Sequence, residues 1–200
     1  MSLIHVNHLT FSYEGNYDTI FDDISFQIDT DWKLGFIGRN GRGKTTFLRL
    51  LMGEEGYEGQ IFSSVEFAYF PYEVKNTDDM ALDVAEQIIG QYEYWQLSRE
   101  IHLLELDEQV LYRPYKSLSQ GERTKLLLAA LFLREDRFLL IDEPTNHLDV
   151  HGRELVSRYL SKKKGFILVS HDRSFLDRCI DHVLCLNRST ICLLYTSRCV

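Results

Sequence analysis

The stretch Gly38-Arg39-Asn40-Gly41-Arg42-Gly43-Lys44-Thr45-Thr46 matches a phosphate-binding loop at each position that carries chemistry. Its three glycines allow backbone conformations that a Cβ atom would forbid, so that successive N–H groups can converge on phosphate oxygens. Lys44 adds a positive charge for the β- and γ-phosphates, Thr45 offers a hydroxyl to a magnesium ion, and a helix that begins here directs its positive end at the anion. The loop therefore predicts a site for a nucleoside triphosphate.

The residues on either side have the pattern that such a loop requires. Leu34, Phe36 and Ile37 predict a short buried strand before the loop, and residues 46–52 predict a helix that Gly53 ends. Strand, glycine loop and helix is the order of the motif. The alternative is a chance match, which partner motifs further along the chain would exclude.

Composition limits the class of protein. The chain has 200 residues, 44% of them hydrophobic, which suits one domain with a sizeable core. A formal net charge of -8 argues against coating nucleic acid by bulk electrostatics, although it leaves room for a local basic patch. The first residues lack a basic segment followed by an apolar one, and no apolar run reaches the ~20 residues of a membrane span. We expect a soluble, cytoplasmic protein.

Cysteines and histidines give little sign of a metal site. The four cysteines contain no C-x-x-C pair, which disfavours both zinc and disulfides; they are Cys179, Cys185, Cys192 and Cys199. His147 and His151 stand four apart and could share a helix face. Without a third ligand nearby, we expect them to be polar residues of a loop and a helix start.

The first third of the chain alternates between apolar and polar residues. Residues 3–12 and 24–28 predict paired antiparallel strands, and 56–62 and 65–70 predict two more strands. Tyr13 ends the first strand, where it can either stack on a purine ring or serve as a half-buried strand aromatic. Between 81 and 106, apolar residues recur at helical spacing and predict two helices, whose aromatic stripe, Trp95 included, we expect in the core.

The second half contains three further chemical motifs. Ser119 and Glu122 form a Ser-x-x-Glu capping box, and the same helix N-terminus can also act as an anion site. A predicted strand at 137–141 runs into Asp142-Glu143, where Asp142 can organise magnesium and Glu143 can polarise a water. A strand at 165–170, reached through a crossover helix at 152–160, ends at His171. The lysines at 162–164 predict the solvated last turn of that helix.

Together these motifs resemble the nucleotide-binding domain of ATP-binding-cassette (ABC) proteins over about residues 2–188. Walker A is 38–46, the signature is 118–122, Walker B is 138–143, the D-loop is 146–149 and the switch histidine is His171. The run 142–149, Asp-Glu-Pro-Thr-Asn-His-Leu-Asp, resembles the ABC-F class, which has paired cassettes, no transmembrane domains and members that act on ribosomes. The neighbourhoods of Walker A, the signature and the switch histidine look most like its Lsa/Vga-type antibiotic-resistance branch.

The resemblance implies a fold and a set of functional residues. The fold is an α/β P-loop NTPase cassette at 1–188 with a parallel-sheet core, an antiparallel β subdomain and a short helical insertion at about 74–117. The implied cofactors are ATP and Mg²⁺, with Glu143 and His171 catalytic and Thr45 and Asp142 on the metal. The implied nucleotide contacts are Tyr13, Gly38, Arg39, Asn40, Gly41, Arg42, Gly43, Lys44, Thr45, Thr46, Ser119, Gln120, Gly121 and Glu122.

Two positions depart from the family pattern. The family has a glutamine after Phe-Pro in its Q-loop, where this chain has Tyr72, which removes an amide expected near the magnesium and the attacking water. Residues 189–200 do not continue the pattern. We therefore expect an atypical tail at 189–200, whose place in the natural protein the sequence leaves open, and a chain truncated before a linker and a second cassette.

The resemblance also implies partners and leaves rival functions. In the family each ATP lies between the Walker A of one cassette and the signature of another, supplied by the same chain or by a homodimer. The favoured function is an ATP-switched, ribosome-binding ATPase that protects ribosomes from antibiotics, with no direct membrane insertion. The alternatives are the motor subunit of a membrane transporter and a module that binds ATP without turnover, which Tyr72 encourages.

Overall fold

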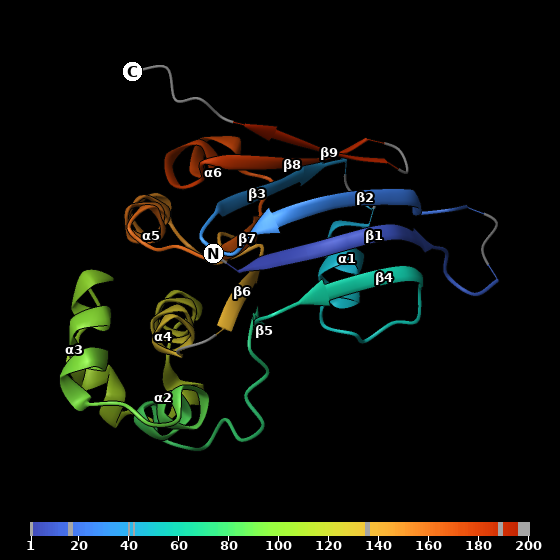
Figure 1. Cartoon of the computed structure of the whole chain (residues 1–200). Coiled ribbons are helices and arrows are strands. Elements are labelled where there is room, and N and C mark those ends of the chain that lie inside the picture. Colours follow the sequence, from blue (N-terminus) through green and yellow to red (C-terminus); the bar gives the residue numbers. More distant parts are fainter. Residues whose placement is uncertain are drawn as a thin grey trace.

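The computed structural model describes residues 2–15, 18–39, 41, 43–134, 137–187 and 190–195 (Figure 1). The strands are β1 (Leu3–Phe11), β2 (Phe21–Asp29), β3 (Lys33–Gly38), β4 (Glu58–Ser63), β5 (Glu66–Phe70), β6 (Arg137–Asp142), β7 (Phe166–Val169), β8 (His182–Asn187) and β9 (Thr190–Tyr195). The helices are α1 (Lys44–Leu51), α2 (Ala81–Ile89), α3 (Tyr94–Leu103), α4 (Gln120–Leu133), α5 (Val150–Ser161) and α6 (Arg173–Cys179). Short 3-10 helices cover Glu108–Tyr112 and Tyr115–Ser117.

A six-stranded sheet forms the centre of the molecule, in the order β5-β6-β7-β3-β8-β9. All neighbours in it run parallel except β8 and β9, which are antiparallel. Every residue of β7 is buried, because strands in the middle of such a sheet are covered on both faces. The carboxyl ends of β3, β5, β6 and β7 consequently lie at one edge of the sheet.

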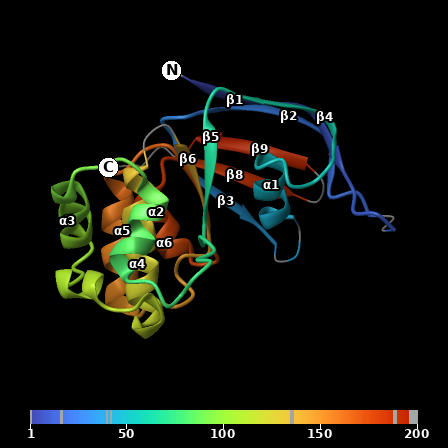
Figure 2. The same cartoon turned by 90° about the horizontal axis from the view of Figure 1, so that it is seen from below.

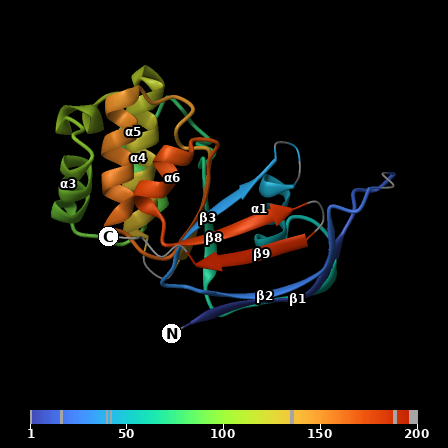
Figure 3. The same ribbon diagram turned by 90° about the horizontal axis from the view of Figure 1, so that it is seen from above.

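The two faces of this sheet are covered by different elements. On β6, Leu139 and Ile141 pack with the helices α2 to α6, whereas Phe138 and Leu140 pack with α1, β1 and β2. This division follows from the period of two in a strand, which points successive side chains to opposite faces. The helices α2 to α6 and the helix α1 therefore lie on opposite sides of β5 and β6 (Figures 2 and 3).

A second sheet of three antiparallel strands, β2-β1-β4, covers α1 (Figure 1). The pairing of β1 with β2 that the alternating sequence predicts is confirmed, with Ile4 opposite Ile28 and Val6 opposite Phe26. The first three of these side chains are buried, and Phe26 packs partly buried on the ring of Phe47 from α1. This packing holds α1, and with it the glycine loop, between the two sheets.

The helices α2 and α3 pack on α4, as the predicted helical insertion requires. A buried ionic cluster ties α3 to α5: Glu100 is 1% exposed and accepts hydrogen bonds from the Tyr159 hydroxyl and the Lys163 ammonium. The prediction of a solvated lysine turn is therefore wrong for Lys163, because a buried carboxylate needs a charged partner. The prediction of a core aromatic stripe is wrong for Trp95, whose ring is 58% exposed under the guanidinium of Arg99.

The sheet extends beyond the point at which the sequence places the end of the cassette. Residue 188 lies outside the described residues, and β9 follows it and pairs with β8 from Asn187↔Thr190 to His182↔Tyr195. Residues 196–200 also lie outside the described part. None of the helices that the structure describes combines the length and the apolar character needed to cross a membrane.

Candidate nucleotide site

The parallel strands bring four sequence motifs to one edge of the central sheet. The strand β3 ends at Gly38, β5 at Phe70, β6 at Asp142 and β7 at Val169. The glycine loop, Tyr72, Glu143 and His171 follow these four strand ends. Ligands of open α/β sheets bind outside the carboxyl ends of the strands, so the predicted residues meet where this fold places its sites.

The glycine loop needs glycine for two separate reasons. Gly41 and Gly43 have φ angles of 71° and 100°, in the left-handed region that disfavours a side chain. A Cβ atom on Gly43 would lie 2.4 Å from the side chain of Ile20. Gly43 is also the N-cap of α1, and because glycine has no side chain it accepts no capping hydrogen bond from the first backbone N–H groups of the helix. Asn40 and Arg42, two predicted nucleotide contacts, lie outside the described residues.

Lys44 lies under the loop as the first residue of α1. Its side chain is buried, and Nζ donates hydrogen bonds to the carbonyl oxygens of Gly38 at 3.0 Å and Arg39 at 3.2 Å. Burial lowers the pKa of Lys44, while the nearby carboxylates of Glu143 and Asp142 oppose that shift. The ammonium is therefore held inside the loop, where it can exchange a carbonyl for a phosphate oxygen.

The two predicted metal ligands are in contact. The Thr45 hydroxyl donates to Oδ2 of Asp142 at 2.7 Å, although the residues are 97 positions apart. Tyr69 on β5 donates its hydroxyl to the same oxygen at 3.1 Å, and burial followed by the Asp142 charge raises the pKa of this tyrosine. Sequence reasoning missed Tyr69. Its one available signal was its place on the strand predicted at 65–70, two residues before Pro71.

Glu143 is held in a strained backbone conformation next to the metal ligands. Its φ is 50°, unusual for a residue with a side chain, and its backbone N–H donates to the Val169 carbonyl of β7 at 2.9 Å. Burial raises the pKa of Glu143, with His171 as the main opposing influence. A raised carboxyl pKa is typical of a group that accepts a proton near neutral pH.

His171 is placed beside Glu143 by the end of β7. Its Nε2 lies 3.2 Å from Oε1 of Glu143. This Oε1 is buried and makes no hydrogen bond with any residue that the structure describes, because the approach of the imidazole has the distance but not the direction of one. The carboxylate thus retains an acceptor for a proton donor such as water.

Tyr13 lies against the helix that follows the glycine loop. Its hydroxyl bonds the Thr46 hydroxyl at 2.8 Å, its ring packs edge-on against Phe11 at 4.9 Å between centroids, and 37% of it is exposed. The structure therefore brings Tyr13 to α1, with part of its ring open to solvent. Purine stacking by this ring stays a prediction.

The signature residues form a separate group at the start of α4. The predicted capping box is confirmed: Glu122 accepts from the Ser119 backbone at 2.7 Å, and the Glu122 backbone donates to the Ser119 hydroxyl at 3.2 Å. Among the described residues, no hydrogen bond or ion pair joins residues 119–122, Gly121 included, to the glycine loop. Gln120 does reach a cavity of about 260 Å³ that is also lined by Tyr72, Asp142 and Glu143.

These residues fit a magnesium-bound nucleotide on structural grounds. The positive-φ glycines, the buried ammonium and the free N–H groups of α1 suit phosphates, while the paired hydroxyl and carboxylate oxygens of Thr45 and Asp142 suit magnesium. The orphaned Oε1 of Glu143 suits a reacting water. Fold and site together define the class: a P-loop ATP-binding cassette.

Comparison with known proteins identifies the family. Residues 21–146 match the family model described as "ABC transporter", and the chain belongs to this family. It is 34% identical over 180 residues to the ribosome protection protein VmlR of Bacillus subtilis, covering 86% of this chain and 32% of that protein. It is 29% identical over 191 residues to ABC transporter F family member 2 of Arabidopsis thaliana, and the match covers 92% of this chain and 28% of that protein. The chain spans between 28% and 40% of the length of such curated relatives.

Solved structures confirm the fold class. The dimeric structure of a bacterial ABC transporter cassette superposes with a TM-score of 0.80, covering 96% of this chain and 98% of that one at 17% identity. The predicted α/β cassette, with its antiparallel and parallel sheets and its helices, is therefore correct. The relatives are of the ABC-F type, as the sequence resemblance implied.

Proposed function

We propose that this chain is a Mg²⁺-dependent ATPase cassette of an ABC-F protein, in which ATP joins two cassettes and thereby switches binding to ribosomes. Support comes from the site residues described above and from the relatives, one of which is named an F family member and another a ribosome protection protein. The Lsa/Vga-type branch and protection from antibiotics are the finer part of this proposal. A ribosomal partner would place the protein in the cytoplasm.

The observation that carries the proposal is the separation of the two nucleotide-binding motifs. Lys44 and Thr45 lie on α1, on one face of the central sheet, whereas Ser119 begins α4 on the other face (Figure 2). One cassette thus offers two half-sites, its phosphate loop and its signature, and each would contact a different ATP molecule. A second cassette, in a longer chain or in a homodimer, would complete each site with its own signature. The similar bacterial cassette is a dimer.

The side chains of this chain would divide the reaction among them. Lys44 and the N–H groups of α1 bind and orient the phosphates, while Thr45 and Asp142 hold the magnesium, which neutralises phosphate charge when bound. Oε1 of Glu143 accepts a proton from the attacking water. His171, whose Nε2 lies 3.2 Å from this oxygen, holds the carboxylate in position. The phosphate that joins the cassettes is then lost, and the cassettes separate.

The net charge of -8 does not oppose a ribosomal partner. Contact with an RNA-rich assembly requires only a local basic face, since charges further away than about 10 Å are screened at moderate salt. The binding would consequently weaken as salt is raised, because each neutralised phosphate releases counterions.

Co-sedimentation with ribosomes tests this function. A Glu143→Gln variant of the chain should bind ATP without consuming it and should pellet with ribosomes in ATP but not in ADP, less so at high salt. The matched control is the double variant Lys44→Ala/Glu143→Gln, which should stay in the supernatant in both nucleotides. Equal sedimentation in ATP and ADP would contradict the switch. Co-purification with a membrane permease, with no ribosome association at low salt, would favour the transporter motor.

A further inference from the structure

The D-loop and the switch histidine are joined by a pair of helices. The D-loop, residues 146–149, leads directly into α5, and His171 stands two residues before α6. In the proposed function, on which this inference rests, the signature meets the second cassette and His171 holds Glu143. The D-loop lies against the signature, since the His147 carbonyl is 3.7 Å from the position of a Cβ atom on Gly121, and it would therefore border the same partner. A contact between α5 and α6 near their first turns would therefore connect the partner cassette to the reacting carboxylate.

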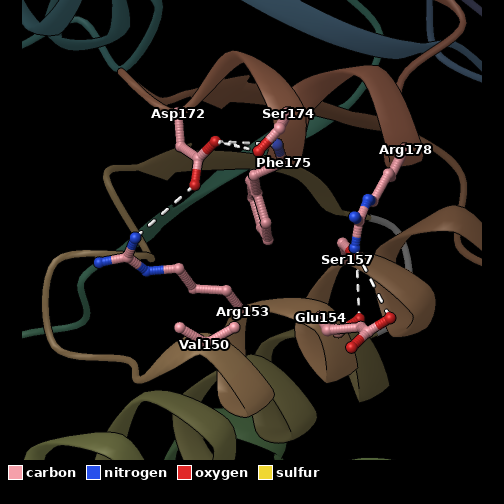
Figure 4. A pocket seen from close by; sticks show the side chains of 8 residues that line it. All are labelled: Val150, Arg153, Glu154, Ser157, Asp172, Ser174, Phe175 and Arg178. Carbon is pink, nitrogen blue, oxygen red and sulfur yellow. Dashed lines mark hydrogen bonds and ion pairs between the residues drawn. The ribbon is translucent and has the colours of Figure 1, made fainter.

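Arg153, in the first turn of α5, makes such a contact. Its Nε donates a hydrogen bond to the Leu148 carbonyl of the D-loop at 3.1 Å. Its Nη1 lies 3.7 Å from Oδ2 of Asp172, the residue that follows His171 (Figure 4). One planar guanidinium thus reaches both segments, which is possible because its donors point in fixed, divergent directions.

Asp172 is itself rigidly oriented. Its Oδ1 caps α6 by accepting from the Phe175 backbone at 3.1 Å and from the Ser174 hydroxyl at 2.6 Å, as Figure 4 shows. Its own backbone N–H donates to the Ser170 hydroxyl at 3.2 Å. The hydrogen bond from the Ser174 hydroxyl lowers the pKa of Asp172, and with the Phe175 backbone N–H and the charge of Arg153 it outweighs the opposing effect of desolvation, so the pKa stays below its ordinary value. Asp172 is therefore a charged, fixed anchor for Arg153.

We propose that Arg153 is a positioning residue that couples the D-loop to His171, so that docking of a second cassette on the D-loop sets the position of Glu143. The path consists of four contacts: Leu148 carbonyl to Arg153, Arg153 to Asp172, the chain step from Asp172 to His171, and His171 to Glu143 at 3.2 Å. Arg153 is 45% exposed, and within the described part of the chain no hydrogen bond or ion pair joins it to Lys44, Thr45 or Asp142. It therefore acts on the reaction only through other groups.

The same pair of helices supplies a matched control. Arg178 of α6 pairs with Glu154 of α5, also at 3.7 Å although both side chains are more exposed, at the other side of the same pocket (Figure 4). This pair also joins α5 to α6, but Glu154 and Arg178 are further along their helices than the D-loop and His171. Loss of the Arg178 pair should loosen the contact between α5 and α6 without affecting the coupling.

Amide hydrogen exchange can test the coupling of the D-loop to Asp172 and His171 in the absence of nucleotide. Asp172→Asn retains the oxygen that caps α6 but loses the charge that attracts Arg153. Exchange of the Leu148 amide should rise about two- to fivefold in this variant, the range expected when an exposed ion pair is lost. Arg178→Ala should leave the exchange rate of the Leu148 amide unchanged. If the Leu148 amide exchanges at the same rate in Asp172→Asn as in the unaltered chain, whether or not exchange in α6 rises, the coupling is overturned.

Kinetics test the consequence for the site. Arg153→Ala should lower ATP turnover at high protein concentration about tenfold, because a small misplacement of reacting groups is costly, while the Kd for Mg-ATP stays within about twofold. Arg153→Lys should recover little, since one ammonium cannot serve both partners. Turnover equal to that of Arg178→Ala would overturn the inference. Failure of the unaltered chain to bind Mg-ATP would instead overturn the proposed function, and the exchange experiment would still decide the coupling.

Discussion

Replacing Tyr69 by phenylalanine would test whether β5 takes part in holding the magnesium ion. The phenol of Tyr69 donates to Oδ2 of Asp142, the oxygen that also accepts from Thr45. Removing the hydroxyl leaves the ring in place and frees one lone pair of a metal-binding carboxylate. The orientation of Asp142 would then depend on Thr45 and on water.

The expected loss of magnesium affinity can be estimated from the hydrogen bond between Tyr69 and Asp142. A hydrogen bond to a charged group contributes about 1.5–3 kcal/mol. Tyr69 and Asp142 are both partly exposed, so water can replace part of this bond, and we take the lower end. About 1.4 kcal/mol corresponds to a tenfold weaker magnesium affinity, within the range known for groups that orient metal ligands.

The assay is a magnesium titration of ATP binding by calorimetry, with Tyr69→Phe compared with the unaltered chain. Tyr92→Phe is the matched control, because the Tyr92 hydroxyl donates to Glu86 at 3.0 Å, outside the site. The midpoint for magnesium should rise about tenfold in Tyr69→Phe and stay unchanged in Tyr92→Phe. Equal midpoints in all three proteins would refute the role given to Tyr69.

Three more outcomes are expected. Lys163→Met should lower the free energy of unfolding by about 1.5–3 kcal/mol, because it removes one of the two cations beside the buried Glu100 carboxylate and leaves Arg99 at 3.1 Å, whereas the exposed Lys164→Met should not; equal urea midpoints would contradict this. Burial opposes the charged form of Glu100, but hydrogen bonds from Lys163 and Tyr159 outweigh it and hold its pKa below the ordinary value. Its stabilisation should therefore be complete above pH ~4.3 and be lost as the pH falls through the lowered pKa; a Glu100→Gln variant whose melting temperature declines equally in acid would disprove this. Tyr72→Gln should speed single-turnover hydrolysis, since it returns an amide to the cavity beside Asp142 and Glu143, and a rate that falls or stays equal would show that tyrosine is no hindrance.

The sequence predicts the parts of this molecule whose physics is local. The helix after the glycine loop, the Ser119 capping box and the apolar run of β6 each depend on neighbouring residues, and each forms as predicted. The meeting of Thr45 with Asp142 was also predictable, because parallel strands place their carboxyl ends at one edge.

The sequence does not reveal contacts that depend on how elements pack. Tyr69 resembles any aromatic on a strand until β5 pairs with β6 and brings it to Asp142. Lys163 resembles a solvated helix end until α3 packs beside α5 and buries Glu100, 63 residues away. The double contact of Arg153 depends on the crossing of α5 and α6. No residue pattern encodes these three relations along the chain.

Binding of Mg-ATP by this chain and by its Lys44→Ala variant tests the central claim most directly. Lys44 donates to two carbonyls of the glycine loop and packs in no apolar cluster, so circular dichroism should show an intact fold in the variant. Calorimetry should show Mg-ATP binding to the unaltered chain and a loss of at least about tenfold in affinity without the ammonium, which contributes a charge-assisted bond to phosphate. An equal affinity of the two proteins, or no binding by the unaltered chain, would contradict the assignment of this site.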